Sequence, residues 1–185
     1  QISEDSEPPA RVIHYGAEGR TEFKALMFIP AHKPFSFGYE EPKGLKLYIQ
    51  RVLIMDSCEG LLPPYLRFVR GVVDSADLPL NISRQTLQQD RHITQIRKWL
   101  TKKVLDTLVG MFEKDYDNYL KFWGQFGRTL KEGVSSDYEN KERILSALLF
   151  QSSADTEKLT TLKGYVERMK EGQEEIYYLT GESRG

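Results

Sequence analysis

The chain has 185 residues, 39% of them hydrophobic and 29% charged, with a formal net charge of −1. This is the composition of an ordinary globular protein with room for a substantial core, and its near-neutrality argues against a nucleic-acid-binding domain, which is normally strongly basic. No apolar run approaches the roughly 18 residues that a membrane helix needs, and the single cysteine, Cys58, rules out an internal disulfide and favours a reducing, cytoplasmic location.

The first quarter of the chain has the pattern of strands joined by turns. We expect an acidic entry linker over residues 1–10, and then a hairpin in which a strand over 11–15 and a strand over 21–29 are joined by a glycine-containing turn. A long surface loop should follow over 30–44. The loop contains three aromatic residues, Phe35, Phe37 and Tyr39. These either cover the sheet, which is the usual fate of such rings, or form an exposed apolar patch.

Residues 45–55 have the strongest strand pattern in the sequence. Apolar side chains fall on both faces, which predicts a central strand that is covered from both sides. A short helical passage over 61–68 should follow, with Pro63 and Pro64 near its first turn, and then another strand at Val72 and Val73. Because strands and helices alternate, we predict an α/β fold with a layered sheet and flanking helices over about residues 10–90.

The second half of the chain has helical periodicity. One helix should run from the Arg84 region to about Glu113, and a small helical bundle should follow, built from helices over 116–130, 142–150 and 162–169. Thr161 is the expected cap of the last helix, weakened because Gly164 stands where a capping box would need Glu or Gln. Residues 175–179 have the pattern of a final strand, followed by a frayed end.

The segment 71–89 joins these two halves and holds the candidate site residues. It passes through an acidic turn to Pro79, which keeps the preceding residue extended. Arg84 and Gln88 then lie four residues apart, on one face of the predicted helix. A guanidinium is a planar, permanently charged donor that suits phosphate or carboxylate oxygens, so Arg84 can reach an anion in a neighbouring site. Alternatively, Arg84 is solvated or pairs with an acid such as Asp77.

The sequence contains no pattern of a self-contained enzyme. It has neither the phosphate-binding loop Gly-x-x-x-x-Gly-Lys nor the dinucleotide-binding motif Gly-x-Gly-x-x-Gly after a strand. Its three histidines, His14, His32 and His92, are scattered without metal-ligand spacing. Cys58 is expected to be a buried structural thiol. Asp74 and Asp77 are expected to cap a turn rather than to form a hydrolytic pair. No metal site is therefore predicted.

Residues 84–103 carry a local net charge of +5, from six basic residues and one acid. The ordinary interpretation is a solvated helix face. A non-specific nucleic-acid surface is the second interpretation, although the near-neutral total and the lack of interleaved aromatic residues count against it.

The segment 70–88 resembles the middle domain of the heat-shock protein 90 chaperone family. The matching residues are Arg70–Ser75, 78–81, Ser83-Arg84 and Leu87-Gln88. The similarity continues in order over nearly the whole chain, through Phe28-Ile29-Pro30, Ile54-Met55-Asp56, Tyr65-Leu66-Arg67-Phe68, Phe122-Trp123, Gln125-Phe126-Gly127, Arg168-Met169-Lys170 and Ile176-Tyr177-Tyr178. The residues of several motifs are most similar to those of the bacterial members of the family, the HtpG type.

The resemblance implies a domain organisation. We expect a linker over 1–10, a larger α/β/α subdomain over 11–113, a helical connector over 114–174, and the first strand of a truncated smaller α/β subdomain over 175–185. The chain, which begins without methionine, is then expected to be part of a longer protein.

The resemblance also implies a function. In this family ATP and Mg²⁺ are bound mainly by an N-terminal domain, on which the middle domain docks. The arginine matched by Arg84 contacts the γ-phosphate and the glutamine matched by Gln88 supports it, so the chain contributes catalytic residues to hydrolysis without being an enzyme by itself. Client proteins and co-chaperones also bind the middle domain, and a C-terminal domain dimerises the chaperone. The positive charge of 84–103 would face the bound ATP.

Two other functions stay open at this point. The chain could be a passive interaction scaffold in which Arg84 is purely structural. It could also be a nucleic-acid-binding module that uses the basic helix over 84–103. The expected partners are nevertheless proteins, with neither nucleic acid nor membrane among them.

Overall fold

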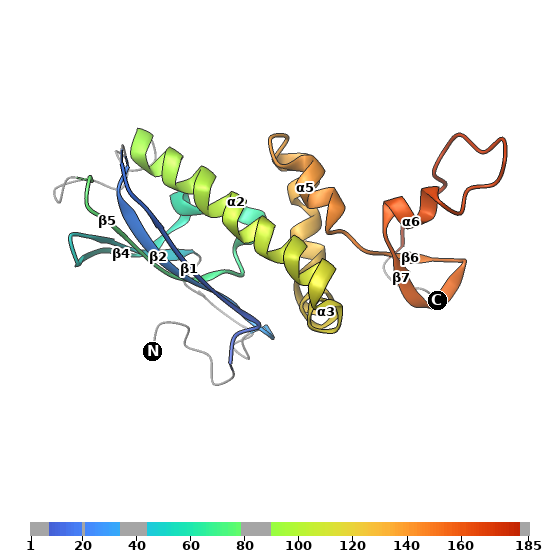
Figure 1. The fold of residues 1–185 in the computed structure, drawn as a ribbon, viewed down its shortest axis with the longest axis horizontal. Coiled ribbons are helices and arrows are strands. Elements are labelled where there is room, and N and C mark those ends of the chain that lie inside the picture. The colour runs from blue at the N-terminus through green and yellow to red at the C-terminus, as the bar shows by residue number, and fades with distance from the viewer. Residues whose placement is uncertain (1–7, 20, 34–43, 79–89, 182–185) are drawn as a thin grey trace.

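The computed structural model describes residues 8–19, 21–33, 44–78 and 90–181. Figure 1 shows a sheet with the long helix α2 across one face, further helices beside it, and a smaller unit with β6, β7 and α6 at the C-terminal end. The mixed α/β fold class predicted from the sequence is confirmed. In the part of the chain that the structure describes, no helix is both long enough and apolar enough to cross a membrane.

The main sheet has five strands in the order β1-β2-β5-β3-β4. Its strands are β1 (Arg11–Ala17), β2 (Phe23–Ile29), β3 (Leu45–Ile49), β4 (Val52–Cys58) and β5 (Arg70–Ser75). The predicted hairpin of β1 and β2 is confirmed, with Arg11 opposite Ile29 and Ala17 opposite Phe23. All neighbouring strands are antiparallel except β3 and β5, which run parallel.

The prediction of one central strand over 45–55 is wrong, because the chain reverses in its middle. Gln50 and Arg51 have positive φ angles of 49° and 67°, and they form a tight turn between β3 and β4. β5 is the central strand, while β4 lies at an edge, where Val52 is 52% and Leu53 49% exposed. Such turns usually contain Gly, Asn or Asp, and neither residue here belongs to that set.

The sheet buries the face that lies against α2. Along β2 every second residue is buried, from Phe23 through Met27 to Ile29, as expected for a strand with one face in the core. Phe23 contacts Trp99 of α2, with ring centroids 5.8 Å apart. β4 and β5 are joined by two short 3₁₀ turns, η1 (Glu59–Leu61) and η2 (Pro64–Leu66), where a single helical passage was predicted.

The helices follow the predicted pattern with two corrections. They are α2 (Arg91–Lys114), α3 (Tyr116–Lys131), α4 (Gly133–Ser136) and α5 (Lys141–Ser146). α2 begins at Arg91, because Asp90 is extended and its carboxylate caps the backbone N–H groups of His92 and Ile93, so one continuous helix does not run through residue 90. The part of the predicted helix before Asp90 lies outside the described residues. The helix predicted over 142–150 ends at Ser146, since the chain from Phe150 enters a strand.

The C-terminal unit contains a hairpin that the sequence did not predict. It consists of β6 (Phe150–Ser152) and β7 (Asp155–Thr160), and the short helix α6 (Leu162–Val166) follows. The predicted cap of α6 is confirmed, since the Thr161 hydroxyl accepts a hydrogen bond from Gly164 N at 2.9 Å.

The strand predicted over 175–179 does not form. A strand requires a partner for its backbone hydrogen bonds, and no element among the described residues pairs with this segment. Its apolar side chains are exposed, from 39% for Ile176 to 98% for Leu179.

Candidate functional site

The two residues predicted to carry the chemistry, Arg84 and Gln88, lie outside the described residues. The structure describes the chain on both sides of them, up to Leu78 after β5 and from Asp90 before α2. Asp74 and Asp77, which were predicted to cap a turn, are among the described residues.

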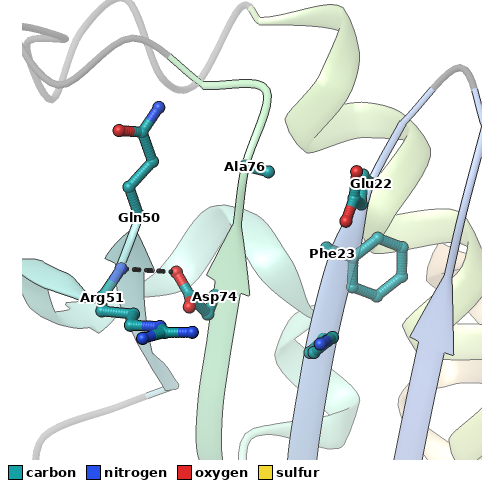
Figure 2. Close-up of a pocket in the computed structure, with 7 residues that line it drawn as sticks. Glu22, Phe23, Gln50, Arg51, Asp74 and Ala76 are labelled. Atoms are coloured by element: carbon teal, nitrogen blue, oxygen red, sulfur yellow. Dashed lines mark hydrogen bonds between the residues drawn. The ribbon is translucent and has the colours of Figure 1, made fainter.

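The end of β5 is held on one side by the turn between β3 and β4. Gln50 N donates to the carbonyl of Ser75 at 3.1 Å, and Arg51 N donates to the Asp74 carboxylate at 3.1 Å. Figure 2 shows the second of these hydrogen bonds bridging the two elements. Both backbone N–H groups of the left-handed turn are thus directed at β5.

The residues after β5 are held on the other side by the start of β2. Ala76 N donates to the carbonyl of Glu22 at 3.1 Å, and the buried Ser75 hydroxyl donates to the same oxygen at 3.4 Å. Glu22 N in turn donates to the Asp77 carboxylate. Leu78 is only 2% exposed, so the chain is anchored in the core at the last described residue of this segment.

A hollow of about 520 Å³ lies between these contacts. It is lined by Glu22, Phe23, Lys24, Gln50, Arg51, Asp74 and Ala76. Figure 2 shows that the lining comes from three elements: the start of β2, the end of β5 and the turn that begins β4. With two cations and two carboxylates the hollow suits polar contacts to another protein surface. It contains no nucleophile paired with a base, and the described residues hold no cluster of metal-ligating side chains.

The basic stretch that continues into α2 is partly used inside the molecule. Lys98 pairs with Glu139 at 3.2 Å, and the Lys103 ammonium lies 5.8 Å from the centre of the Tyr15 ring. Arg91 and Lys102 are exposed. These contacts fit the interpretation of α2 as a solvated helix face that also braces its neighbours.

Cys58 has the environment of a structural thiol. It is 3% exposed, and burial raises the pKa of its thiol although the backbone N–H groups of Gly60 and Leu61 act in the opposite direction. A thiol with a raised pKa is a poor nucleophile. Cys58 therefore takes no part in the candidate site.

One polar contact outside the site was not predicted. The Tyr65 hydroxyl donates to the Asp137 carboxylate at 2.7 Å, and Asp137 also accepts from Asn140 N at 3.1 Å. Burial and the carboxylate together raise the pKa of Tyr65 far above its usual range. The two residues are 72 positions apart, so no local signal in the sequence could have paired them.

Comparison with known proteins gives consistent matches over the whole chain. The family model described as Hsp90 protein matches residues 1–185. Chaperone protein HtpG of Geobacter sulfurreducens is 57% identical over 185 residues, which are 99% of this chain and 28% of that protein. Its counterpart in Streptomyces coelicolor is 53% identical over 186 residues, 99% of this chain and 29% of that protein. The chain thus spans less than a third of the length of these relatives.

A solved structure matches the fold as well. The middle domain of a putative heat shock protein of Plasmodium falciparum superposes with a TM-score of 0.82 at 33% sequence identity. The match covers 97% of this chain and 69% of that one.

Proposed function

Since the chain belongs to the Hsp90 family and corresponds to its middle domain, we propose that it completes the ATPase site of an HtpG-type chaperone by supplying Arg84 to the γ-phosphate. The observation that carries the proposal is the family match over residues 1–185, which includes the segment with Ser83-Arg84 and Gln88. The nucleotide and its Mg²⁺ would be bound by the N-terminal domain of the same protein. Gln88 supports the arginine in this arrangement.

The physical role of Arg84 follows from the charge on the phosphoryl group. As the γ-phosphoryl leaves, charge is spread over its oxygens, and a cation already in place stabilises this state most in a closed site from which water is excluded. A guanidinium can donate two parallel hydrogen bonds to such oxygens. The described contacts of Asp74 and Asp77 support the proposal, because they hold the chain firmly at the point where it leaves β5.

We also propose that the chain binds client proteins of the chaperone and possible co-chaperones. The edge strand β4 is a candidate surface, because Val52 and Leu53 expose about half of their side chains. Exposed apolar side chains at a sheet edge are suited to bind unfolded or extended segments. The dimeric state and cytoplasmic location stay predictions from the family.

The proposal can be tested by ATP turnover. The N-terminal ATPase domain is titrated with this chain, wild type against Arg84→Ala, and Arg128→Ala serves as a control because Arg128 is an exposed arginine on α3, outside the basic stretch 84–103. We expect Arg84→Ala to lower the stimulated rate of ATP hydrolysis at least about tenfold, since arginines in comparable positions increase kcat by about 10³- to 10⁵-fold in other phosphoryl-transfer enzymes. Arg128→Ala should retain the stimulation.

Equal stimulation by the wild type and by Arg84→Ala would instead support a scaffold that acts only by docking. If neither stimulates, the comparison is repeated in the full-length chaperone, where docking no longer depends on concentration. Salt-dependent binding of DNA or RNA by the chain, with a steep slope, would support the nucleic-acid alternative.

A further inference from the structure

The chain leaves β5 between two carboxylates that each accept a hydrogen bond from a backbone N–H group of a neighbouring segment. Asp74 binds Arg51 N, at the turn between β3 and β4, and Asp77 binds Glu22 N, just before β2 begins. Neither contact is local, since the partners are 23 and 55 positions away in the sequence. The two aspartates therefore connect the end of β5 to the elements on both of its sides.

We propose that Asp74 and Asp77 are positioning residues for ATP hydrolysis, which act through Arg84 by fixing the place and direction in which the chain leaves the sheet. This inference rests on the proposed function of Arg84. Neither aspartate is required to touch the nucleotide. The hydrolysis rate of the chaperone should depend on both, whereas its affinity for ATP should not.

The contact of Asp74 counteracts an unfavourable backbone conformation. Gln50 and Arg51 are both in the left-handed region, which side chains with a Cβ rarely adopt. Such residues persist only where their surroundings determine the conformation. Here the surroundings are β5 itself, since Gln50 N and Arg51 N bind Ser75 and Asp74. Loss of the Asp74 carboxylate should therefore loosen the turn and the end of β5 together.

The contact of Asp77 extends the sheet by one step beyond its last strand pair. Phe23 and Ser75 form the last pair of β2 and β5, and Ala76 N then binds the carbonyl of Glu22. The Asp77 carboxylate accepts a hydrogen bond from Glu22 N. Both backbone polar groups of Glu22 are therefore hydrogen-bonded to the chain that leaves β5. The buried Leu78 completes the anchor.

Small displacements at such an anchor have large consequences for catalysis. A misplacement of about 1 Å that originates far from the chemistry can cost about 10²-fold in rate. Arg84 follows Leu78 by six residues, so the anchor determines where that short segment starts. Asp77 itself is exposed, which means that its loss should alter the position of the chain without removing core packing.

The test is a double-mutant cycle in the full-length chaperone. Single substitutions Asp77→Ala, Asp74→Ala and Arg84→Ala are combined pairwise, and kcat and KM for ATP are measured. Asp56→Ala is the matched control, because Asp56 lies in the same sheet and pairs with Lys46 at 2.8 Å, away from the end of β5. Asp77→Asn keeps an acceptor oxygen and serves as the conservative variant.

We expect Asp77→Ala and Asp74→Ala to lower kcat by about fivefold or more and to leave KM within about twofold, as for the loss of an interaction made only in the transition state. Added to Arg84→Ala, they should lower the residual rate no further. Asp77→Asn should recover most of kcat, and Asp56→Ala should behave as wild type.

Two results would overturn the inference. One is an equal loss of kcat from Asp77→Ala in the presence and absence of Arg84, since the aspartate would then act independently. The other is an unchanged kcat in both aspartate variants. An unaffected kcat in Arg84→Ala alone would instead refute the proposed function, so the two failures are distinguishable.

Amide hydrogen exchange gives a second readout that does not depend on activity. Asp77→Ala should accelerate exchange at Glu22, and Asp74→Ala should accelerate it at Arg51, because each variant removes the acceptor of that N–H group. Asp56→Ala should change neither. Unchanged exchange at both positions would show that the contacts are absent in solution and would overturn the inference whatever the kinetics.

Discussion

The body of the molecule and its C-terminal unit are stabilised in different ways. The body, up to Leu149, has a continuous core in which the large side chains of the sheet, α2 and α3 are buried. The C-terminal unit, described over 150–181, has no buried residue among those that the structure describes. A two-stranded hairpin with a short helix is marginal without a core. The body should therefore fold cooperatively by burial, whereas the unit depends on local hydrogen bonds and on its contacts with the body.

The local hydrogen bonds of the C-terminal unit are numerous. The Asp155 carboxylate accepts from the N–H groups of Glu157 and Lys158, and the Tyr165 hydroxyl binds Gln173 and the backbone of Tyr177. Each exposed bond of this kind contributes only about 1 kcal/mol. We therefore expect substitutions of buried residues in the body to lower the free energy of unfolding by several kcal/mol, and substitutions in the C-terminal unit to change it by about 1 kcal/mol or less.

The largest effect is expected at Gly71, in the central strand of the body. Its φ angle is 143°, and a Cβ added there would lie 2.1 Å from the Leu26 carbonyl oxygen and 2.8 Å from Met27 Cα. Backbone atoms cannot give way as a side chain can, so Gly71→Ala should cost about 4 kcal/mol or more, or prevent folding. Urea unfolding followed by circular dichroism measures the loss.

A matched control is Gly124→Ala, because a Cβ at Gly124 in α3 meets no atom within 4 Å. This variant should be neutral or gain up to about 1 kcal/mol from helix propensity. If Gly71→Ala unfolds at the same urea concentration as this control, the result would contradict the close approach of the β5 and β2 backbones at Gly71.

The second prediction compares one apolar side chain in each region. Phe122 is fully buried and packs against Phe68, with ring centroids 5.2 Å apart, whereas Val166 in α6 is 52% exposed. Phe122→Ala should lower the free energy of unfolding by about 3–5 kcal/mol, through lost transfer energy and the cavity left behind. Val166→Ala should change it by less than about 0.5 kcal/mol. Comparable losses in the two variants would refute the division into two regions.

The same contrast explains how far the fold could be predicted. Strong periodicity over a buried face was sufficient for β1, β2, β5, α2 and α3, because burial selects apolar residues at fixed intervals. The hairpin of β6 and β7 escaped prediction because its strands bury almost nothing and so carry no such pattern. The turn at Gln50 and Arg51 escaped because its conformation is fixed by β5, which lies more than twenty residues further along the chain.

The candidate site could be predicted in its residue types but not in its contacts. Asp74 and Asp77 were expected to bond backbone N–H groups of their own turn, as aspartates between strand and helix usually do. They do bind backbone N–H groups, but those of Arg51 and Glu22 on the neighbouring elements. The order of strands in the sheet decides these partners, and this order depends on tertiary packing rather than on local sequence.

The third prediction concerns the pH dependence of the body, through Asp137. Burial raises the pKa of this carboxyl, but the hydrogen bonds from Tyr65 and Asn140 outweigh it, so the pKa lies below its usual range. A carboxyl whose folded pKa is depressed contributes stability above its unfolded pKa, near 4, and this contribution is lost as the pH falls through the folded value.

Asp137→Asn should therefore lower the free energy of unfolding by about 1.5–3 kcal/mol at pH 7, the usual contribution of a hydrogen bond to a charged group. The difference from wild type should shrink as the pH falls below about 4, where the carboxyl of the unfolded chain begins to be protonated, and should continue to shrink as the pH falls through the lower folded pKa. Urea unfolding at a series of pH values measures it. A difference that is constant from pH 7 to pH 3 would show that the charge of Asp137 is irrelevant.

The smallest effect is expected at the junction of the two regions, where Lys131 of α3 contacts the first residue of β6. The Lys131 ammonium lies 4.5 Å from the centre of the Phe150 ring and 5.4 Å from that of Trp123. A cation over an aromatic face contributes about 0.5–1 kcal/mol at an exposed site. Burial lowers the pKa of Lys131, which means that part of this gain is offset by lost hydration.

Lys131→Met keeps the apolar stem and removes the charge, so it should accelerate proteolysis within 150–181 by about two- to fivefold, the equivalent of about 0.5–1 kcal/mol. The free energy of unfolding of the body should fall by no more than the contact with Trp123 contributes, about 1 kcal/mol. Lys131→Arg retains a cation and should behave as wild type. Lys121→Met is the control, because Lys121 lies on the same helix and its ammonium contacts Asn118 rather than a ring. If Lys131→Met is cleaved no faster than this control, the apolar packing of Phe150 alone holds the unit to the body. If the free energy of unfolding of the body falls by more than about 1 kcal/mol, which exceeds what the contact with Trp123 contributes, the two regions unfold as one cooperative unit.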